Sequence, residues 1–309
     1  MRKTNHKLQI TKTNSALFVF ALLLALAFYL LPSKLNAQSA IPLVVAPARQ
    51  SLTADPGKTV GFAVRFYNTG TEPISGVFKA ADFIVNNKQG SPVFLEGPEV
   101  LSQRYSAANW VKLSSDKGTI PAAGMVTIQG SVNVPKDAAP GGKYFAIYFE
   151  PESNIPSPSG VRQEETSSVS VRIAGLIYMR VSGPISESAN IVKFSAPGFS
   201  EYGPIAVTTE ILNNGDYHIT PKGTIVVKDM LGHEVAQADL AETNIFPSSS
   251  REIISKLGTK WMVGRFTADL NATYGESGKQ LASSLAFWVF PWKVAVVIAL
   301  GIIIIILAV

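Results

Sequence analysis

Two histidines, His218 and His233, are the candidates for acid–base or metal chemistry in the body of the chain, because His6 lies in the N-terminal segment. His233 and Glu234 begin like the zinc-protease motif H-E-x-x-H, but Gln237 stands where the second histidine ligand is required. His218 follows a run of turn-forming residues, which favours a structural or surface role over that of a ligand or base. Neither histidine therefore predicts a metal site.

Serine and carboxylate chemistry has no better support. Ser114 and Lys117 match the S-x-x-K spacing of serine acyl enzymes, but they stand beside Gly118 in a β context, and the sequence has no K-T-G partner. Glu164 and Glu165 form an acidic pair in a loop rather than two carboxylates held across a cleft. The absence of cysteine excludes disulfides, thiolate metal sites and cysteine nucleophiles. We expect no enzyme, no catalytic, metal or cofactor-binding residue and no cofactor; the ligand-binding residues are unknown.

Two tryptophans and one modification motif are the remaining candidates. Trp110 and Trp261 are expected to fill cores, and the alternative for each is an exposed surface on which a ligand stacks. Asn271-Ala272-Thr273 matches a glycosylation acceptor, which matters only in a cell that has the modifying machinery.

Short β-strands must position these residues. Apolar and polar residues alternate with a period of two, and Gly, Pro, Asn and Ser separate the runs, as is typical of antiparallel β-sandwiches. No convincing amphipathic helix occurs between the two ends of the chain, which argues against an α/β enzyme fold. The predicted fold class is all-β, with two tandem Ig-like sandwiches. The expected strands include Val60–Phe66, Val126–Val134, Tyr144–Phe149, Val169–Ile173, Ile225–Val227 and Phe266–Leu270.

The body reads as a duplication of one unit. Each half has an Asn-x-Gly turn, a Pro that opens a polar turn, and a Gly-basic-aromatic start to a strand. The first unit is longer, with the excess around Asn86–Asn109, which we interpret as an inserted loop. The matching segments are Asn68-Thr69-Gly70 with Asn213-Asn214-Gly215, Pro121-Ala122-Ala123-Gly124 with Pro247-Ser248-Ser249-Ser250, and Gly142-Lys143-Tyr144 with Gly264-Arg265-Phe266.

Two segments are irregular. Pro151–Thr166 is rich in Pro and Ser and predicts a long exposed hairpin loop. The inserted loop Asn86–Asn109 contains several apolar residues. These could form a binding surface, although we favour the simpler interpretation that they cover the open end of the first sandwich.

The N-terminal residues 1–37 have the layout of an export signal. A basic stretch precedes the apolar run Ala16–Leu31, and small residues follow, with cleavage expected after Ala37. An uncleaved signal-anchor is the alternative.

The C-terminal residues 287–309 predict a transmembrane helix. Val294–Val309 is uncharged and apolar, and Phe287–Trp292 would supply the remaining length together with interfacial tryptophans. Six of the 27 Lys and Arg residues lie in the two ends, whereas all 22 Asp and Glu lie between Gln38 and Ala286. The body is therefore nearly neutral, which gives no electrostatic case for nucleic acid as a partner.

The motifs resemble a known family. Val45-Ala46-Pro47, Asp55-Pro56-Gly57, Asn109-Trp110-Val111 and Val134–Tyr144 are similar to the first domain of the bacterial WxL-interacting proteins, and the second unit is similar to their second domain. The resemblance implies a peptidoglycan-binding domain, a domain that binds WxL-type surface proteins or host ligands, and a membrane anchor. No residue here matches a known ligand contact of that family.

These observations together predict a membrane-anchored extracytoplasmic binding or adhesion protein, single-pass in the cell membrane. Its two sandwiches, residues 41–183 and 184–286, would face peptidoglycan, another wall polymer or a WxL-type surface protein. The alternative is an export or assembly chaperone, or a structural stalk, that acts by donating sheet edges.

Overall fold

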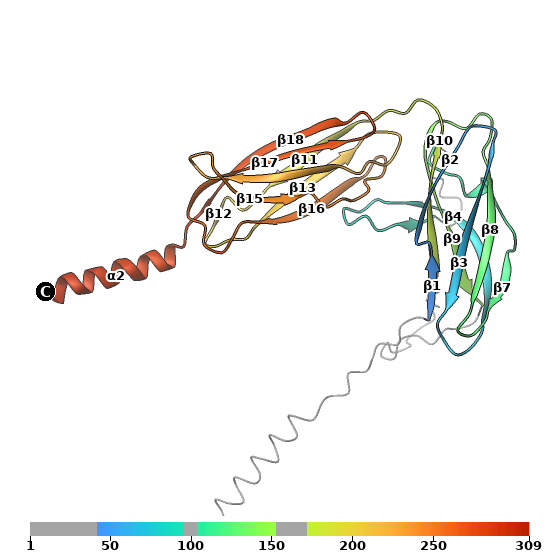
Figure 1. The fold of residues 1–309 in the computed structure, drawn as a ribbon, viewed down its shortest axis with the longest axis horizontal. Coiled ribbons are helices and arrows are strands. Elements are labelled where there is room, and N and C mark those ends of the chain that lie inside the picture. Colours follow the sequence, from blue (N-terminus) through green and yellow to red (C-terminus); the bar gives the residue numbers. More distant parts are fainter. Residues whose placement is uncertain (1–41, 96–103, 153–171, 309) are drawn as a thin grey trace, which may run out of the picture. The chain divides into compact units, whose positions relative to one another are not determined.

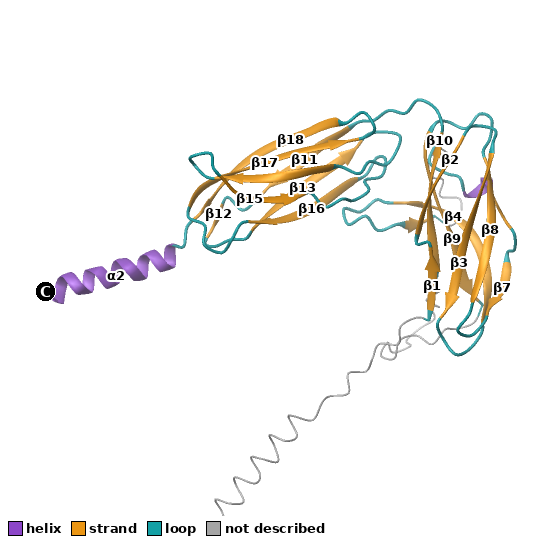
Figure 2. Cartoon of the chain, in the orientation of Figure 1, coloured by secondary structure: helices purple, strands orange, loops and turns teal. Residues whose placement is uncertain are grey.

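The computed structural model describes residues 42–95, 104–152 and 172–308. The described chain is all-β apart from one short 3-10 helix and one C-terminal α-helix, and its strands pair into β-sandwich sheets (Figure 2). The all-β part of the predicted fold class is confirmed. The predicted export segment, residues 1–37, lies outside the described residues, as do Glu164 and Glu165.

The first sandwich is built from the N-terminal group of strands (Figure 1). One sheet has the order β1-β3-β8-β6 and the other β2-β10-β9-β4-β5, with β7 also paired to β4. The pairs are antiparallel except for β2 and β10, which are parallel. The elements are β1 (Leu43–Ala46), β2 (Arg49–Ala54), β3 (Thr59–Asn68), β4 (Ile74–Ile84), β5 (Val93–Phe94), η1 (Ala108–Trp110), β6 (Val111–Leu113), β7 (Lys117–Ile120), β8 (Met125–Asn133), β9 (Gly141–Pro151) and β10 (Ile173–Val181).

The second sandwich repeats this arrangement. Its sheets have the orders β11-β13-β16 and β12-β18-β17-β14-β15, and β12 is parallel to β18 as β2 is to β10. The elements are β11 (Ala189–Ser195), β12 (Phe199–Ser200), β13 (Ile205–Asn213), β14 (Lys222–Lys228), β15 (Glu234–Asp239), β16 (Ser250–Leu257), β17 (Gly264–Tyr274) and β18 (Lys279–Val289), followed by α2 (Trp292–Ala308). The domain limits expected at residues 183 and 286 stay predictions, and β18 itself runs on to Val289.

Period-two alternation explains both cores. On β3, Phe62, Val64 and Phe66 are buried, whereas the residues between them are exposed. In the first core, Phe78 lies with its ring centroid 5.3 Å from Phe66 and 4.9 Å from Phe149. The second core is more aliphatic and includes one stacked aromatic pair, in which Phe266 lies 5.8 Å from Phe287.

A buried asparagine fixes the same turn in each sandwich. Asn68 donates from Nδ2 to the Glu72 carbonyl at 2.7 Å, and its Oδ1 accepts from the Gly70 N–H at 2.9 Å. Asn213 likewise donates to Tyr217 at 2.8 Å and accepts from Gly215 at 2.8 Å. The Asn-x-Gly pattern found in the sequence thus marks a turn that the asparagine side chain holds with hydrogen bonds to the backbone.

For the other two pairs of matching segments, the residues that correspond in the structure differ by one position from those matched in the sequence. The Asn68 N–H donates to Gly124 and the Asn213 N–H to Ser249, so Ala123 corresponds to Ser248; both have positive φ, 49° and 59°. The strand starts that correspond are Gly141 and Gly264, since each has positive φ and pairs with the last residue of the next strand. Lys143 therefore takes the inward position that Phe266 has in the second sandwich.

The predicted transmembrane helix over 287–309 is wrong, and with it the single-pass membrane localisation. Phe287 is 1% exposed in the second core, and residues 287–289 belong to β18 rather than to a helix. The remaining helix, α2, has 17 residues, or about 26 Å at 1.5 Å each, against a hydrocarbon core of about 30 Å. Among the described residues, no helix combines the length and the apolar character needed to cross a bilayer.

Candidate functional site

His218 has a structural environment, as the sequence suggested. Its backbone N–H donates to the Tyr144 hydroxyl at 2.8 Å, and its ring lies 5.3 Å from that of Tyr178 and 6.0 Å from that of Phe246. Burial lowers the pKa of His218 from 6.5 to about 4, so the imidazole is neutral at neutral pH. A half-buried, neutral histidine among aromatic rings is a packing residue.

The remaining sequence candidates do not converge. His233 is exposed in a turn, with Nδ1 3.2 Å from Asp229 Oδ2. The Ser114 hydroxyl accepts from the Gln129 N–H at 3.2 Å, while Lys117 is exposed at the start of β7. Within residues 42–95, 104–152 and 172–308, no cluster of three or more His, Cys, Asp or Glu could hold a metal ion.

The two tryptophans differ in how far they are buried. Trp110 is half-buried against the first core, and the buried Lys143 amine lies 5.6 Å above its ring. Trp261 is 64% exposed, so the expectation that it fills a core is wrong. Its ring instead meets Tyr202 edge-on at 5.6 Å, with the Lys260 amine 5.3 Å from the Trp261 ring.

Apolar residues of the inserted loop cover a sheet face. Phe94 stacks on Tyr148 of β9 with ring centroids 6.3 Å apart, and Tyr105 packs against the cluster formed by Phe83, Tyr144 and neighbouring residues. In the described part of the loop, Phe94 and Tyr105 therefore cover the outer face of β9, whereas Ala107 is buried in the first core. The expectation that the loop covers the open end of the sandwich stays a prediction.

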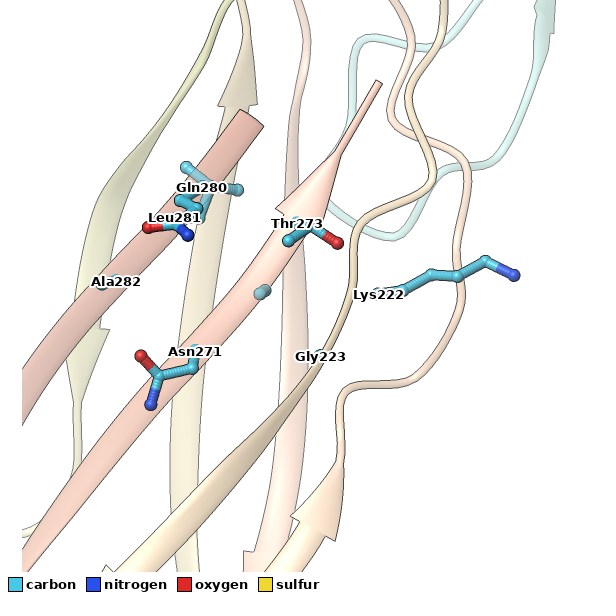
Figure 3. A pocket seen from close by; sticks show the side chains of 8 residues that line it. Lys222, Gly223, Asn271, Thr273, Gln280, Leu281 and Ala282 are labelled. Carbon is cyan, nitrogen blue, oxygen red and sulfur yellow. The ribbon is translucent and has the colours of Figure 1, made fainter. Parts of the chain in front are cut away.

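The described pocket is a shallow hollow of about 280 Å³ on the second sandwich (Figure 3). Asn271 and Thr273 of β17 line it together with Gln280 of β18, and the Lys222 side chain extends away from the strands. Lys222 is the one titratable lining group, and it pairs with Glu242 at 3.2 Å. Without an acid–base pair, this lining can form hydrogen bonds but supplies no reaction.

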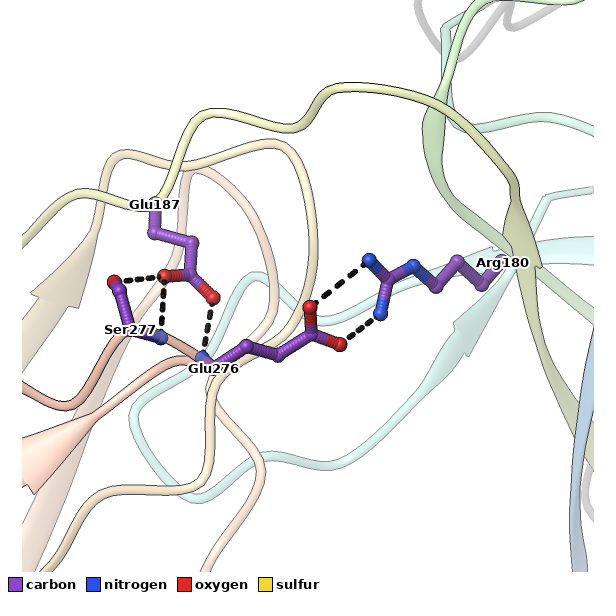
Figure 4. Close-up of polar contacts among 4 residues, drawn as sticks. All are labelled: Arg180, Glu187, Glu276 and Ser277. Atoms are coloured by element: carbon purple, nitrogen blue, oxygen red, sulfur yellow. Dashed lines mark hydrogen bonds and ion pairs between the residues drawn. The ribbon is translucent and has the colours of Figure 1, made fainter.

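A charged network joins β10 to the β17–β18 turn (Figure 4). The Arg180 guanidinium donates to both carboxylate oxygens of Glu276, one of them at 3.1 Å. The Glu276 N–H donates to Glu187 at 2.6 Å, and the Ser277 hydroxyl donates to the same carboxylate at 2.6 Å. That hydroxyl bond lowers the pKa of Glu187. Because the carboxylates of Glu187 and Glu276 both have hydrogen-bond partners within the chain, the network has a structural role.

The point at which the first strand changes sheet differs between the sandwiches. β1 pairs with β3 over four residues, the chain crosses at Pro47, and β2 pairs with β10 over six. β11 has seven residues, the crossing comes at Pro197, and β12 pairs with β18 over only two. Because proline has no N–H to donate, its position ends the first half of the strand.

The late crossing leaves β18 with the longest unpaired strand edge among the described residues. β17 covers one side of β18 from Lys279 to Val289, whereas β12 covers the other side only at Trp288 and Val289. We call the remaining nine residues, Lys279–Phe287, the β18 edge.

Backbone groups of this edge point away from the sheet. The Trp288 N–H donates to the Gly198 carbonyl on the β12 side at 2.9 Å. Because the pointing direction repeats every second residue, the N–H and C=O groups of Gln280, Ala282, Ser284 and Ala286 face the same open side. No described backbone group pairs with them.

The β18 edge lacks the usual protection against strand addition. Three other edges among the described residues carry charges or a register shift: β15 has Glu234 and Asp239, β16 has Arg251 and Lys256, and β11 shifts beside Lys193. Residues 280–289 contain no charge and no proline, and the register with β17 is unbroken. Unprotected edges are templates for pairing with another chain.

A second, shorter open edge lies on the first sandwich. Since β1 pairs only with the Arg65–Asn68 part of β3, Thr59–Val64 has no partner on that side among the described residues. The Thr69 N–H donates to Pro42 on the β1 side at 2.8 Å, so Ala63 and Gly61 point their backbone groups the same way. Sequence reasoning named no edge, although the positions of Pro47 and Pro197 were the available signal.

Comparison with known proteins gives only distant likenesses. No protein-family model and no curated protein matches the sequence. Three similar solved structures are a chaperone–tip adhesin complex for CFA/I fimbriae biogenesis (14% identity, TM-score 0.38, 79% of this chain and 98% of that chain), the Pseudomonas aeruginosa CupB2 chaperone (12%, 0.35, 79% and 100%) and the E. coli chaperone DraB (13%, 0.33, 78% and 95%).

These findings correct the predicted partners. The three similar structures named above are chaperones or contain one, and among the described residues no helix is long and apolar enough to span a membrane. The prediction of peptidoglycan or another wall polymer, of a WxL-type surface protein, and of a membrane reached through residues 287–309 is therefore wrong. The resemblance to the WxL-interacting family is tested by none of the comparisons and stays a prediction.

Proposed function

We propose that this chain is a non-enzymatic assembly chaperone that holds extended segments of client proteins by pairing them with its open sheet edges. The observation that carries the proposal is the β18 edge, in which the eight residues Gln280–Phe287 have no charge, no proline and no described backbone partner on the open side. Main-chain hydrogen bonds to an edge supply affinity for many sequences, which suits a protein that must hold varied clients briefly.

The rest of the described chain supports holding rather than reacting. His218 is half-buried and neutral, and the lining of the pocket contains Lys222 but no acidic residue. The rigid, antiparallel sheets behind each edge keep its backbone groups in line, so that little ordering cost falls on the chaperone side when a strand adds.

Photo-crosslinking from single positions tests the proposal. A photo-reactive residue replaces Ala282 on the β18 edge or Ala63 on the open part of β3 in the full chain, expressed in its own cells. The matched control replaces Asn271, which is exposed on the same sheet as Ala282 but belongs to β17, a strand paired on both sides.

We expect discrete client adducts from at least one edge position and clearly fewer from Asn271, which lies opposite Ala282 but one strand further from the open side. If adducts form equally from Asn271 and from both edges, or from no position at all, the proposed mode of binding is wrong.

A further inference from the structure

We propose that the β18 edge takes a client strand that runs parallel to β18, with an apolar side chain of that strand covering Leu285. This inference rests on the proposed function and adds the edge, the strand direction and the side-chain chemistry.

The first sandwich contains the template. Its last strand, β10, corresponds to β18, since Val181 and Val289 pair with the equivalent glycines Gly141 and Gly264. In the first sandwich β2 occupies the matching edge, runs parallel, and receives a hydrogen bond from the Leu176 N–H to the Ala48 carbonyl at 3.0 Å. The position of β18 equivalent to Leu176 is Ser284.

The covering strand in the first sandwich seals the core. Leu52 of β2 lies beside Met179, and the two are 8% and 0% exposed. Gln50 lies beside Ile177, which is fully buried. The β18 counterpart of Ile177 is Leu285, which faces inward and yet stays partly exposed, as does Ser283. β11 lies close to β18 but pairs with β13 in the other sheet, so the sheet that contains β18 is one strand short along this edge.

The chain itself limits where the client strand can end. Residues 196–198 cross from β11 to β12 at the Phe287 end of the edge, and Gly198 already accepts from Trp288. The position available to a client strand is thus the side of Gln280–Ala286. A strand that runs parallel to β18, in the direction of β12, would meet the crossing with its C-terminal end.

The chemistry of the client segment follows from its neighbours. Side chains that lie beside Ser283 and Leu285 point between the two sheets, where an unpaired charge is costly. Side chains that lie beside Ala282 and Ser284 point outward over small residues and have room for large groups. The partner is an alternating extended segment that has no charge at its inward-facing positions and an apolar residue opposite Leu285.

A synthetic peptide with the sequence of Arg49–Thr53, capped at both ends, is the probe. Because residues 196–198 stop the client strand before Phe287, the peptide is shifted by two residues relative to β2 on β10: its Leu would lie beside Leu285 and its Gln beside Ser283. The comparison peptide replaces that Leu with Asp. Binding to the full chain is measured by fluorescence anisotropy, and a photo-reactive group at the peptide's C-terminus reports the direction of the strand.

We expect saturable binding, weakened at least about tenfold by the Asp peptide and by Ser284→Pro in the protein. Ser284→Pro removes an N–H that faces the open side rather than β17, so the sheet itself is retained. The matched variant Asn271→Ser changes an exposed side chain of the same sheet and should bind the peptide normally. The photo-adduct should map to residues 196–198.

Three results would overturn the inference. An adduct near residues 276–280 would show antiparallel addition. A dimer in sedimentation that Ser284→Pro abolishes would identify a second copy as the occupant. No peptide binding, with client adducts still formed from Ala63, would reject the β18 edge while leaving the proposed function in place; loss of adducts from every edge would reject both.

Discussion

The last strands of the two sandwiches occupy the same place in the same topology but have opposite surroundings. On β10, the Leu176 N–H is bound by β2 and Tyr178 is 5% exposed beneath other aromatic rings. On β18, the equivalent Ser284 and Ala286 are exposed, and the backbone beside them has no described partner. One sandwich closes the edge that the other leaves open.

A small displacement of one proline accounts for this difference. The strand that begins each sandwich can pair with β3 or β13 on one sheet, or with β10 or β18 on the other, and the crossing decides how it is divided. An early crossing closes β10 and opens part of β3, and a late crossing does the reverse. A duplicated fold can thus acquire a binding edge without any change to its core.

Paired proline substitutions give the largest expected effect. Leu176→Pro removes the hydrogen bond to Ala48, orphans that carbonyl and loosens the Leu52 side chain, for a loss of roughly 4 kcal/mol in the free energy of unfolding. Ser284→Pro at the equivalent position should lower it by only about 1 kcal/mol, because its N–H has no ladder partner and the one bond lost is the exposed bond from its hydroxyl to Asp269, 2.7 Å long. Urea denaturation of both variants measures the difference, and an equal loss would mean that the β18 edge is already paired.

Acid should loosen the covered face of the first sandwich through His218. Burial depresses the pKa of this base from 6.5 to about 4, so the unfolded chain binds more protons than the folded chain between these values. Stability is complete above pH 6.5 and falls as the pH drops towards 4, by roughly 3 kcal/mol in all.

Comparison with His218→Phe isolates this effect. The neighbouring groups Tyr144, Tyr178 and Tyr217 are neutral throughout that range, because burial raises the pKa of each. The free energy of unfolding of the wild-type chain should drop more between pH 7.5 and 4.5 than that of the variant. Identical pH profiles would show that the imidazole is hydrated rather than packed.

Both buried asparagines should contribute to the free energy of unfolding, and Asn213 should contribute more than Asn68. Each makes three hydrogen bonds, but Asn213 donates at 2.8 Å to both of its acceptors, whereas the second bond of Asn68, to Ile120, is 3.3 Å long. Asn213→Ala should lower the free energy of unfolding by about 2 kcal/mol, and Asn68→Ala should lower it somewhat less. Thermal unfolding of the two variants gives the ranking. If Asn213→Ala leaves the stability unchanged, the hydrogen bonds of Asn213 do not stabilise the turn.

Local patterns were enough to predict the strands and the repeat. Alternation marked β3, β8 and β17, because one face of each is buried and the other is not. The Asn-x-Gly turns were visible because their residue types are fixed by backbone geometry. The matches of Pro121 with Pro247 and of Gly142 with Gly264 were each off by one residue, since a proline or a glycine can serve at neighbouring positions of a turn.

Properties set by distant neighbours could not be predicted in this way. Phe287–Val289 reads equally well as part of an apolar helix or as a strand, and only pairing with β17 decides it. Trp261 has the residue type of a core but stands 64% exposed, and residue type alone does not fix burial. The open edge depends on which strand lies beside β18, which no local pattern records.

The smallest expected effect comes from Lys143, which occupies in the first sandwich the inward position that Phe266 has in the second. Its side chain points into the first core where the second has Phe266, and it donates to the Arg104 carbonyl. Burial, and then the charge of Arg104, lower the pKa of Lys143, so the folded chain releases this proton before the unfolded chain does. The unfolding free energy should therefore rise as the pH increases towards 10.5. Lys143→Met should abolish that rise and stabilise the first sandwich by about 1 kcal/mol at pH 7. A destabilised Lys143→Met would show instead that the bonds to Arg104 and Trp110 outweigh the burial of the charge.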